Sequence, residues 1–455
     1  MNAHHVRRIA WIPVILLVAV TGRSFAQDSN YWSTAYGTRS QLLGGVVIGS
    51  PGDISSVYYN PGALALTKST ELLLAGNAYQ YQHVSVDNGS GPGKTLVASS
   101  LTAVPSLFAG EIPVLKHDRL AYAFLTRRSM DMEIDSRTTT GVEELAPIAS
   151  PVFSAAEIQL HQNFSEGWYG MTWAHQLSPT LGLGVSPFVV VRSQHTRAAL
   201  LTEGEDAGGQ AAILTTTREF DYLHWGALAR VGLSGVRDSL TYGLALTSPS
   251  LGITGAGNTN YNTTLIDQTG TIGNVIGADY QNGRKADFRT PFGAGAGASY
   301  GWRDTRLHAA VDWNAAVGQY TVLESPDFVI HTPGGDSTAH VVITDHLDAV
   351  FNWGVGIEHR FGRTLSGFAS YHTDRSGRIA GDPPGASLTR WNLNDVATGA
   401  TWHVWRSDLA LGLAAAFASQ ATPTPATTPD GRPVPANLQT HEMLLTVTLG
   451  WKVTF

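Results

Sequence analysis

The stretch His441–Phe455, HEMLLTVTLGWKVTF, ends the chain with two kinds of residue in strict alternation. The residues between the apolar positions are mainly small or polar, and a period of two predicts a β-strand. The run of about a dozen residues exceeds the five or six usual in soluble strands and suits a tilted membrane strand of about 9–11 residues. We therefore expect a strand with one face in lipid. Its apolar parity consists of Met443, Leu445, Val447, Leu449, Trp451, Val453 and Phe455.

The same alternation recurs upstream, in Phe351–Phe361 (FNWGVGIEHRF), Thr305–Trp313 (TRLHAAVDW) and Asp408–Phe417 (DLALGLAAAF). Aromatic residues stand at the ends of these runs, as they do in the interfacial girdles of transmembrane barrels. Strands are predicted near 71–83, 101–112, 119–135, 151–175, 180–198, 216–233, 239–253, 285–300, 305–323, 341–360, 364–375, 388–405, 408–419 and 441–455.

The connections between the predicted strands alternate in length. The long ones are 84–100, 136–150, 199–215, 254–284, 324–340, 376–387 and 420–440. Turns of a few residues lie between them, and short periplasmic turns that alternate with longer outer loops are typical of an outer-membrane barrel. We therefore predict an all-β fold over residues 70–455, an antiparallel transmembrane barrel of about fourteen strands that crosses the bacterial outer membrane many times.

The first 26 residues have the pattern of a secretory signal peptide. Arg7 and Arg8 precede the apolar run Ile9–Val20, and Ser24-Phe25-Ala26 provides a cleavage site. The chain carries a net charge of -7 and has no cysteine. An acidic balance argues against nucleic acid as a partner, and the lack of cysteine excludes a disulfide framework. No motif predicts a cofactor.

Residues 27–69 precede the first predicted strand and include Ser55–Leu66, SSVYYNPGALAL. Asp53 is a candidate cap for a short helix, and Pro61 keeps Asn60 out of the helical region, which ends that helix. A barrel of this strand number has a lumen wide enough to leak unless something fills it. We therefore expect residues 27–69 to form a hatch inside the barrel.

The motif Asn60-Pro61-Gly62 resembles the Asn-Pro-Ala-Gly-Leu-Ala motif in the hatch of the outer-membrane long-chain fatty acid and aromatic hydrocarbon transporters (the FadL/TodX family), with Gly62-Ala63 in place of the Ala-Gly order. Ser248-Pro249 and the stretch TPFGAGAGASYGWRDTRLHAAVDW at 290–313 are similar to further parts of that family. The resemblance implies a hatch-gated barrel that passively carries hydrophobic small molecules, long-chain fatty acids or similar, with capture among the outer loops and lateral exit through the wall. It also implies contact with outer-membrane lipids and recognition of the last strand, which ends at Phe455, by the barrel assembly machinery.

A carboxylate inside the barrel needs a cation. Lys285 and Arg289 are the bases of inward parity nearest to the glycine row at 293, 295 and 297, which leaves space for a ligand or for the hatch. Apolar residues of the outer loops are expected to form a capture patch, and of these we single out Phe328 and Ile330. The other members of the expected patch are Leu265, Ile266, Ile272, Val275, Ile276 and Val329.

Three motifs permit other chemistry. GAGAG at 293–297 lacks the strand-to-helix context of a phosphate loop, and GASYG places Ser299 within a strand rather than at the sharp turn of a hydrolase, so no enzyme activity is expected. Asp131, Glu133 and Asp135 share one parity and fit either a Ca²⁺ site or a solvated rim; we predict no metal site. The functional alternatives are a FadL-like barrel that shuttles or anchors secreted proteins, and a general porin.

Overall fold

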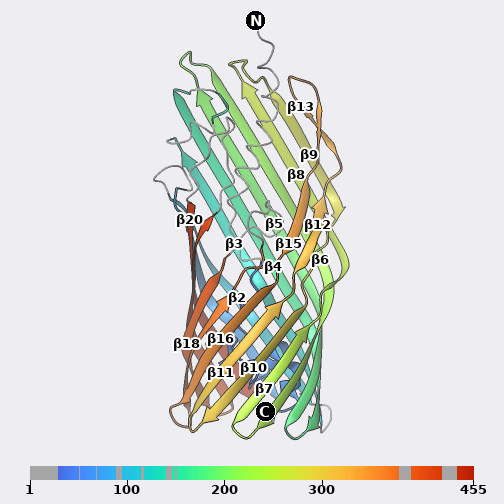
Figure 1. Ribbon diagram of the computed structural model, residues 1–455, viewed down its shortest axis with the longest axis vertical. Coiled ribbons are helices and arrows are strands. Elements are labelled where there is room, and N and C mark those ends of the chain that lie inside the picture. Colours follow the sequence, from blue (N-terminus) through green and yellow to red (C-terminus); the bar gives the residue numbers. More distant parts are fainter. Residues whose placement is uncertain are drawn as a thin grey trace.

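The alternation predicted from the sequence produces a wall of strands that closes on itself (Figure 1). The computed structural model describes residues 29–50, 52–67, 69–88, 95–113, 117–139, 146–148, 151–378, 391–422 and 438–455; the signal peptide predicted for residues 1–26 lies outside them. Fourteen antiparallel strands form the ring. They are β1 (Glu71–Val86), β2 (Leu96–Pro113), β3 (Asp118–Thr138), β4 (Phe153–Ser178), β5 (Leu181–Glu205), β6 (Ala211–Arg237), β7 (Leu240–Thr247), β10 (Gly293–Trp302), β11 (Thr305–Asn314), β16 (Val350–Arg360), β17 (Leu365–Asp374), β18 (Leu393–Val404), β19 (Ser407–Thr422) and β20 (Leu438–Thr454).

The ring closes where the last strand meets the first. β20 pairs with β1 from Glu71↔Thr454 to Val86↔Thr440. The turns at the lower end of Figure 1 are tight, and the connections after β6, β10 and β18 hold non-glycine residues at positive φ, at Asp238 (53°), Arg303 (52°) and Trp405 (58°). Because short turns mark the periplasmic side of such barrels, the lower end is periplasmic and the upper end is the outer one.

On one side the wall rises far above the ring, because β3 to β6 are two to three times as long as β10 and β11 (Figure 1). β6 is 27 residues long and pairs with β7 over its periplasmic end, from Arg230 to Arg237, and with β8 over the longer outer part, from Ala212 to Ala227. The outer strands are β8 (Leu251–Asp267), β9 (Val275–Lys285), β12 (Val317–Glu324), β13 (Phe328–His331), β14 (Ser337–Ala339) and β15 (Val342–Leu347). The regions 254–284 and 324–340 are predicted as loops but contain strands. Their outer faces are rich in Asn and Thr because they meet water rather than lipid, so the sequence lacks the apolar alternation of the membrane strands.

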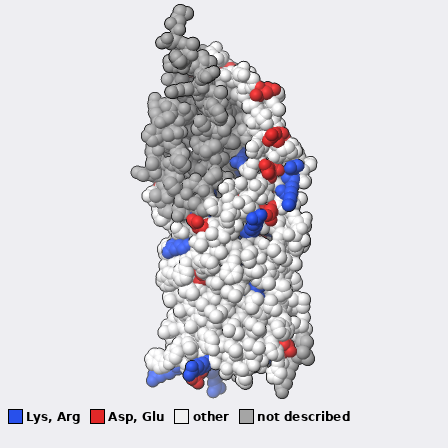
Figure 2. Space-filling model, turned by 45° about the vertical axis from the view of Figure 1, so that its right-hand side comes forward, with Lys and Arg blue, Asp and Glu red and all other residues white. Residues whose placement is uncertain are grey.

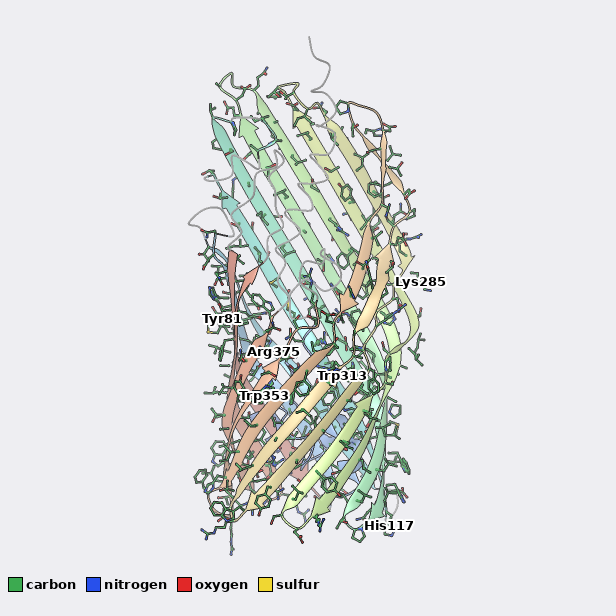
Figure 3. The ribbon with its side chains drawn as sticks, in the orientation of Figure 1. Tyr81, His117, Lys285, Trp313, Trp353 and Arg375 are labelled. Carbon is green, nitrogen blue, oxygen red and sulfur yellow. The ribbon has the colours of Figure 1, made fainter. Side chains whose placement is uncertain are left out.

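An apolar belt surrounds the lower half of the barrel. On β20 the predicted lipid-facing parity is exposed, for example Leu449 at 49% and Trp451 at 46%, whereas Glu442 and Thr448 of the other parity are buried. Figure 2 shows the belt as a white zone between charges at the base and charges higher on the wall, and Trp313 and Trp353 lie near mid-height in Figure 3. The lower half is thus the membrane-spanning part, and the outer strands extend beyond it.

The wall is incompletely paired between β2 and β3. Within the described residues of these strands, the ladder runs only from Leu107↔Leu125 to Pro113↔Arg119, although β2 continues outward to Leu96 and β3 to Thr138. Pro105 has no N–H to donate, and β3 is bulged between Thr126 and Arg128. The outer parts of the two strands therefore pair only with β1 and β4, their neighbours on the other side.

Residues 29–67 lie inside the ring, in its lower half (blue in Figure 1). They contain three helices of one turn each, α2 (Arg39–Leu42), α3 (Ser56–Tyr59) and α4 (Pro61–Leu64). Their side chains share one hydrophobic core with inward residues of the wall, such as Leu73, Leu107 and Trp168. In the described part of the chain, no helix is long and apolar enough to cross a membrane. We call residues 29–67 the hatch.

Candidate functional site

The Asn-Pro-Gly motif fastens the hatch to the wall. Asn60 has extended backbone and caps α4, because its Oδ1 accepts a hydrogen bond from Gly62 N (3.2 Å). Its Nδ2 donates to the carbonyl of Ile48 in the hatch (3.0 Å) and to that of Leu233 in β6 (3.0 Å). Pro61 occupies the first position of α4, where no N–H is needed. One buried amide thus joins two parts of the hatch to a wall strand.

Gly62 lies directly on the backbone of β5 and β6. A Cβ at this position would lie 2.5 Å from the carbonyl oxygens of both Gly182 and Gly232. From the wall side, a Cβ at Gly184 would lie 2.4 Å from the carbonyl group of Pro61. The order Gly62-Ala63 is therefore required here, because alanine at position 62 does not fit this contact.

The glycine row of β10 receives the other side of the hatch. A Cβ at Gly297 would lie 2.7 Å from Gly49 N, and one at Gly295 would lie 2.7 Å from the side chain of Ile48. The row faces inward as its parity predicts, and the space beside it is filled by the hatch. Backbone therefore packs on backbone at two places on the ring.

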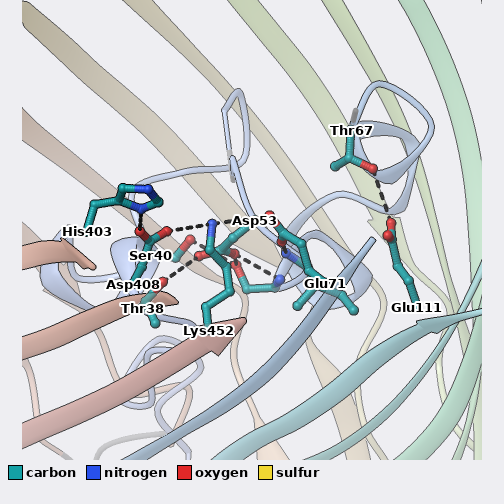
Figure 4. A network of polar contacts seen from close by, with 11 residues as sticks. Thr38, Ser40, Asp53, Thr67, Glu71, Glu111, His403, Asp408 and Lys452 are labelled. Atoms are coloured by element: carbon teal, nitrogen blue, oxygen red, sulfur yellow. Dashed lines mark hydrogen bonds and ion pairs between the residues drawn. The ribbon is translucent and has the colours of Figure 1, made fainter. Parts of the chain in front are cut away.

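Charged contacts hold the hatch at its periplasmic side. Arg39 of α2 donates to Glu358 of β16 through Nη2 (2.6 Å) and Nε (2.8 Å), with both side chains only 16% exposed. Further along the same side of the ring, Lys452 lies 2.9 Å from Asp408 and 3.2 Å from Glu71. Glu71 in turn accepts the N–H of Ile54 in the hatch, at 2.9 Å (Figure 4). These two latches span the ring from β16 to β1.

The hatch also completes the unpaired edge of β3. Tyr36 donates its hydroxyl to the carbonyl of Thr126 (3.2 Å), and Thr34 donates to the carbonyl of Arg127 (3.3 Å). Tyr36 N donates to the hydroxyl of Tyr59 (2.9 Å), and burial raises the pKa of that hydroxyl well above its ordinary value, so it stays neutral. The hatch thus closes the wall from inside where β2 and β3 separate.

Above the hatch lies a narrow cavity with cationic and aromatic walls. Arg127 and Arg230 line it beside Tyr58 and Trp168, and the Arg230 guanidinium lies 4.7 Å from the centre of the Tyr58 ring. The cavity has a volume of only ≈ 40 Å³, whereas a benzene-binding cavity in a protein measures about 150 Å³. In this conformation this cavity is too small for an organic ligand of that size.

A buried ion pair borders the cavity on its outer side. Arg192 of β5 is fully buried; it donates to Glu166 of β4 (3.2 Å) and to the hydroxyl of Tyr222 (2.9 Å). Its guanidinium lies 3.8 Å from the ring centre of Phe288. Phe288 and Tyr222 belong to the apolar cluster of the outer half, so this ion pair separates the cavity from that cluster.

That outer cluster contains the capture residues singled out from the sequence. Phe328 and Ile330 are buried at 9% and 8% exposure, and the Phe328 ring lies 5.3 Å from that of Tyr261 on β8. They join inward residues of β5, β6, β8 and β9 with the β12–β15 hairpin. Of the other predicted patch residues, Leu265, Val275 and Ile272 belong to this cluster, whereas Ile266, Ile276 and Val329 are exposed on the opposite parity.

No protein-family model matches the sequence, and no curated protein does either. Solved structures do match. The toluene transporter TodX of Pseudomonas putida is 13% identical with a TM-score of 0.59, over 92% of this chain and 98% of that one. A FadL homologue of Pseudomonas aeruginosa is 11% identical with a TM-score of 0.56, over 94% and 100%. The toluene transporter TbuX of Ralstonia pickettii is 11% identical with a TM-score of 0.54, over 92% and 98%.

This chain has the fold of the FadL/TodX channels. At this identity the likeness is one of fold, and it confirms the predicted fourteen-stranded antiparallel barrel. The proteins that the chain resembles are channels rather than enzymes. In line with this, Ser299 lies within β10, where its hydroxyl contacts Thr241 (2.7 Å) and Arg306 (3.1 Å) rather than projecting from a strand–helix turn.

The two bases predicted to meet a ligand carboxylate lie apart in this FadL/TodX fold. Lys285 ends β9 and is exposed on the right flank of the wall in Figure 3, so the expectation that it points inward is wrong. The polarity of β9 reverses there, because Ala286 and Phe288 turn inward in its place. Arg289 does line the cavity, although half exposed; it pairs with Asp287 (3.0 Å).

The cations nearest the hatch were missed from the sequence. Arg127 and Arg128 are consecutive, so a regular strand would send one of them outward, yet both are buried because the bulge in β3 turns both inward. Arg192 and Arg230 lie on the inward parity of their strands, which is the signal that could have found them. The acids Asp131, Glu133 and Asp135 face outward and are exposed, opposite the buried Met130, Met132 and Ile134.

Proposed function

We propose that this protein is a passive channel that moves hydrophobic small molecules, long-chain fatty acids or similar, across the outer membrane. The observation that carries the proposal is the unpaired stretch between β2 and β3, which the hatch closes from inside through Tyr36 and Thr34. A hatch that moves there opens the lumen sideways to lipid.

The outer cluster supports capture at the cell surface. It buries a continuous apolar surface around Phe328, Ile330 and Leu323 above the membrane-spanning part. Removing apolar area from water favours binding by about 25 cal/mol per Å², so a hydrophobic ligand gains most of its binding free energy by inserting among these side chains. β12 and β15 are connected through the short β13–β14 hairpin, which pairs with the wall at only two positions of β9, so the cluster can part there.

The next step along the lumen requires the hatch to move. The cavity below the cluster is too small for a ligand, and the Arg192–Glu166 ion pair lies across the way. A carboxylate that reached this level would meet Arg127 and Arg230, neither of which is in an ion pair with a described carboxylate. These residues replace Lys285 as our candidates for the ligand head group, together with Arg289.

Exit is proposed through the wall rather than downward. The base of the hatch is held by charged latches, and the space under it is lined by polar groups, so it offers no path for an apolar chain. The β2–β3 opening instead leads to the lipid side. No nucleotide-binding motif is present in the sequence, so transport follows the concentration gradient of the ligand.

A reversible lock on the hatch tests this proposal. The hydroxyls of Ser29 in the hatch and Ser376 in the wall are in direct contact, and the chain has no cysteine, so Ser29→Cys/Ser376→Cys introduces a single disulfide. We expect uptake of a radiolabelled long-chain fatty acid into proteoliposomes to fall when the variant is oxidised and to recover on reduction. Labelled toluene is the comparison for an aromatic substrate.

The alternatives give different results in the same assay. A general porin would pass small hydrophilic sugars at least as fast as the fatty acid, with or without the lock. A barrel that only shuttles or anchors proteins would take up neither. The transport proposal would be overturned if the reduced variant took up no fatty acid, whether or not it passed sugars.

A further inference from the structure

A second cavity lies under the hatch at the periplasmic end and differs from the one above it. It has a volume of ≈ 690 Å³, within the range of about 300–1,000 Å³ typical of small-molecule sites. Thr38, Arg39 and Gly52 of the hatch form its roof, and inward residues of β16 to β20 form its side. We call this cavity the vestibule.

The chemistry of the vestibule is polar and cationic. Phe368 is the only large apolar side chain among its described lining residues. Four of the lining side chains are permanent cations, and they are Arg39, Arg360, Arg363 and Lys452. Such a space does not favour a hydrophobic ligand, whereas its positive potential attracts an anionic solute.

Part of this charge has no protein partner. Glu358 forms an ion pair with Arg39, and Asp408 forms one with Lys452. In the part of the chain that the structure describes, no ion pair joins Arg360 or Arg363 to a carboxylate, and both side chains are exposed to the vestibule. Three carboxylates line the vestibule, Asp304, Glu358 and Asp408, so the four lining cations outnumber them by one.

We propose that the vestibule binds a soluble oxyanion from the periplasm, a carboxylate or a phosphate, and that the bound anion competes with Glu358 for Arg39. Guanidinium groups bind such anions through paired N–H donors. Arg39 places Nε and Nη2 on one oxygen of Glu358 and Nη1 on the carbonyl of Ser50 (2.6 Å). An anion that draws Arg39 away therefore releases the β16 latch of the hatch.

The position of the vestibule favours a soluble anion over a membrane lipid. Its wall residues lie on the inward parity, with Glu358 opposite Phe368 and Ser366 opposite Thr401 in the register. The lipid-facing parity of the same strands carries Ile357 and Trp402, which are exposed to the belt. The binding half of the proposal is independent of the transport function, whereas the release of the hatch rests on it.

Calorimetric titration of the full-length protein in zwitterionic detergent tests the binding. With ionic strength held constant by chloride, we expect inorganic phosphate and acetate to bind saturably, and Arg360→Gln/Arg363→Gln to weaken binding at least tenfold. Arg303→Gln/Arg406→Gln is the matched control, since these arginines stand in neighbouring periplasmic turns and do not line the vestibule. Absence of saturation, or an equal loss in both variants, would overturn the proposal.

Two further arms separate its parts. Phosphate should increase amide hydrogen exchange over residues 38–50 in the wild type and not in Arg360→Gln/Arg363→Gln; binding without this increase would overturn the competition with Glu358. If phosphate binding disappears in nanodiscs that contain phosphatidylglycerol, the site belongs to a lipid headgroup, and a soluble ligand is ruled out. Loss of fatty acid uptake alone would affect the transport proposal and leave the anion site standing.

Discussion

Replacing Gly62 with alanine tests whether closure depends on backbone contact between α4 and the wall. The new Cβ would lie 2.5 Å from the carbonyl oxygens of Gly182 and Gly232, whereas a carbon–oxygen contact needs about 3.3 Å. Both oxygens belong to paired strands, so α4 must move by about 0.8 Å. Overpacking of this kind costs about 1–3 kcal/mol, which shifts the equilibrium between a closed and a displaced hatch by about 5–150-fold.

Single-channel recording in planar bilayers measures this shift as the frequency of openings. Gly184→Ala should reproduce the result from the wall side, because its Cβ would lie 2.4 Å from the carbonyl group of Pro61. Gly318→Ala is the matched control, since its Cβ meets no atom within 4 Å. If Gly62→Ala and Gly184→Ala open no more often than Gly318→Ala, backbone packing does not hold the hatch closed.

Three other substitutions probe separate contacts. Asn60→Ala removes the side-chain partner of Gly62 N and of the Ile48 and Leu233 carbonyls; a buried group left without its hydrogen bond costs about 1–3 kcal/mol, so amide exchange over residues 54–66 should rise, and unchanged exchange would contradict the capping role. Lys452→Met removes the cation beside the buried Glu71, while Asp408 keeps His403 as a partner; loss of one partner from a buried pair costs about 3–5 kcal/mol, so the calorimetric unfolding temperature should fall, and an unchanged temperature would refute the latch. Burial acts to raise the pKa of Asp267, but hydrogen bonds from residues 269, 273 and 272 outweigh it and hold the pKa below its usual range; this outer turn should therefore stay ordered above about pH 4 and loosen below it, whereas Asp267→Asn should raise its amide exchange already at neutral pH.

The strands of the membrane belt could be predicted because lipid imposes a simple rule on their outer face. In β20 the apolar residues Met443, Leu445, Leu449 and Trp451 are exposed on one parity, and the alternation is visible in the sequence of His441–Phe455. The outer strands obey no such rule. On β8, the outward residues Asn258, Asn260 and Asn262 alternate with inward side chains. Because the outward residues are polar, this strand has the sequence pattern of a loop.

The residues of the candidate site likewise fall into those that could be predicted from the sequence and those that could not. Asn60, Pro61 and Gly62 could be found because a short motif determines a local backbone shape. Arg127 and Arg128 could not, because their direction depends on a bulge beside Arg128 that only the pairing with β4 creates, whereas Arg192 and Arg230 follow the inward parity of their strands. The reversal that turns Lys285 outward is likewise a property of the β8–β9 ladder, whose register shifts between Gly257 and Thr259.

The glycine contacts between hatch and wall also limit which substitutions this protein can accept during evolution. Neither Gly62 nor its neighbours in β5 and β6 can acquire a single methyl group unless the other surface recedes. Drift on one side is therefore blocked until a compensating change arises on the other. A hatch transplanted from a protein with the Ala-Gly order would bring its methyl group one residue too early for this barrel. Substitutions in the hatch and in the facing wall strands should therefore occur together, and a chimera should take its hatch and its barrel from the same protein.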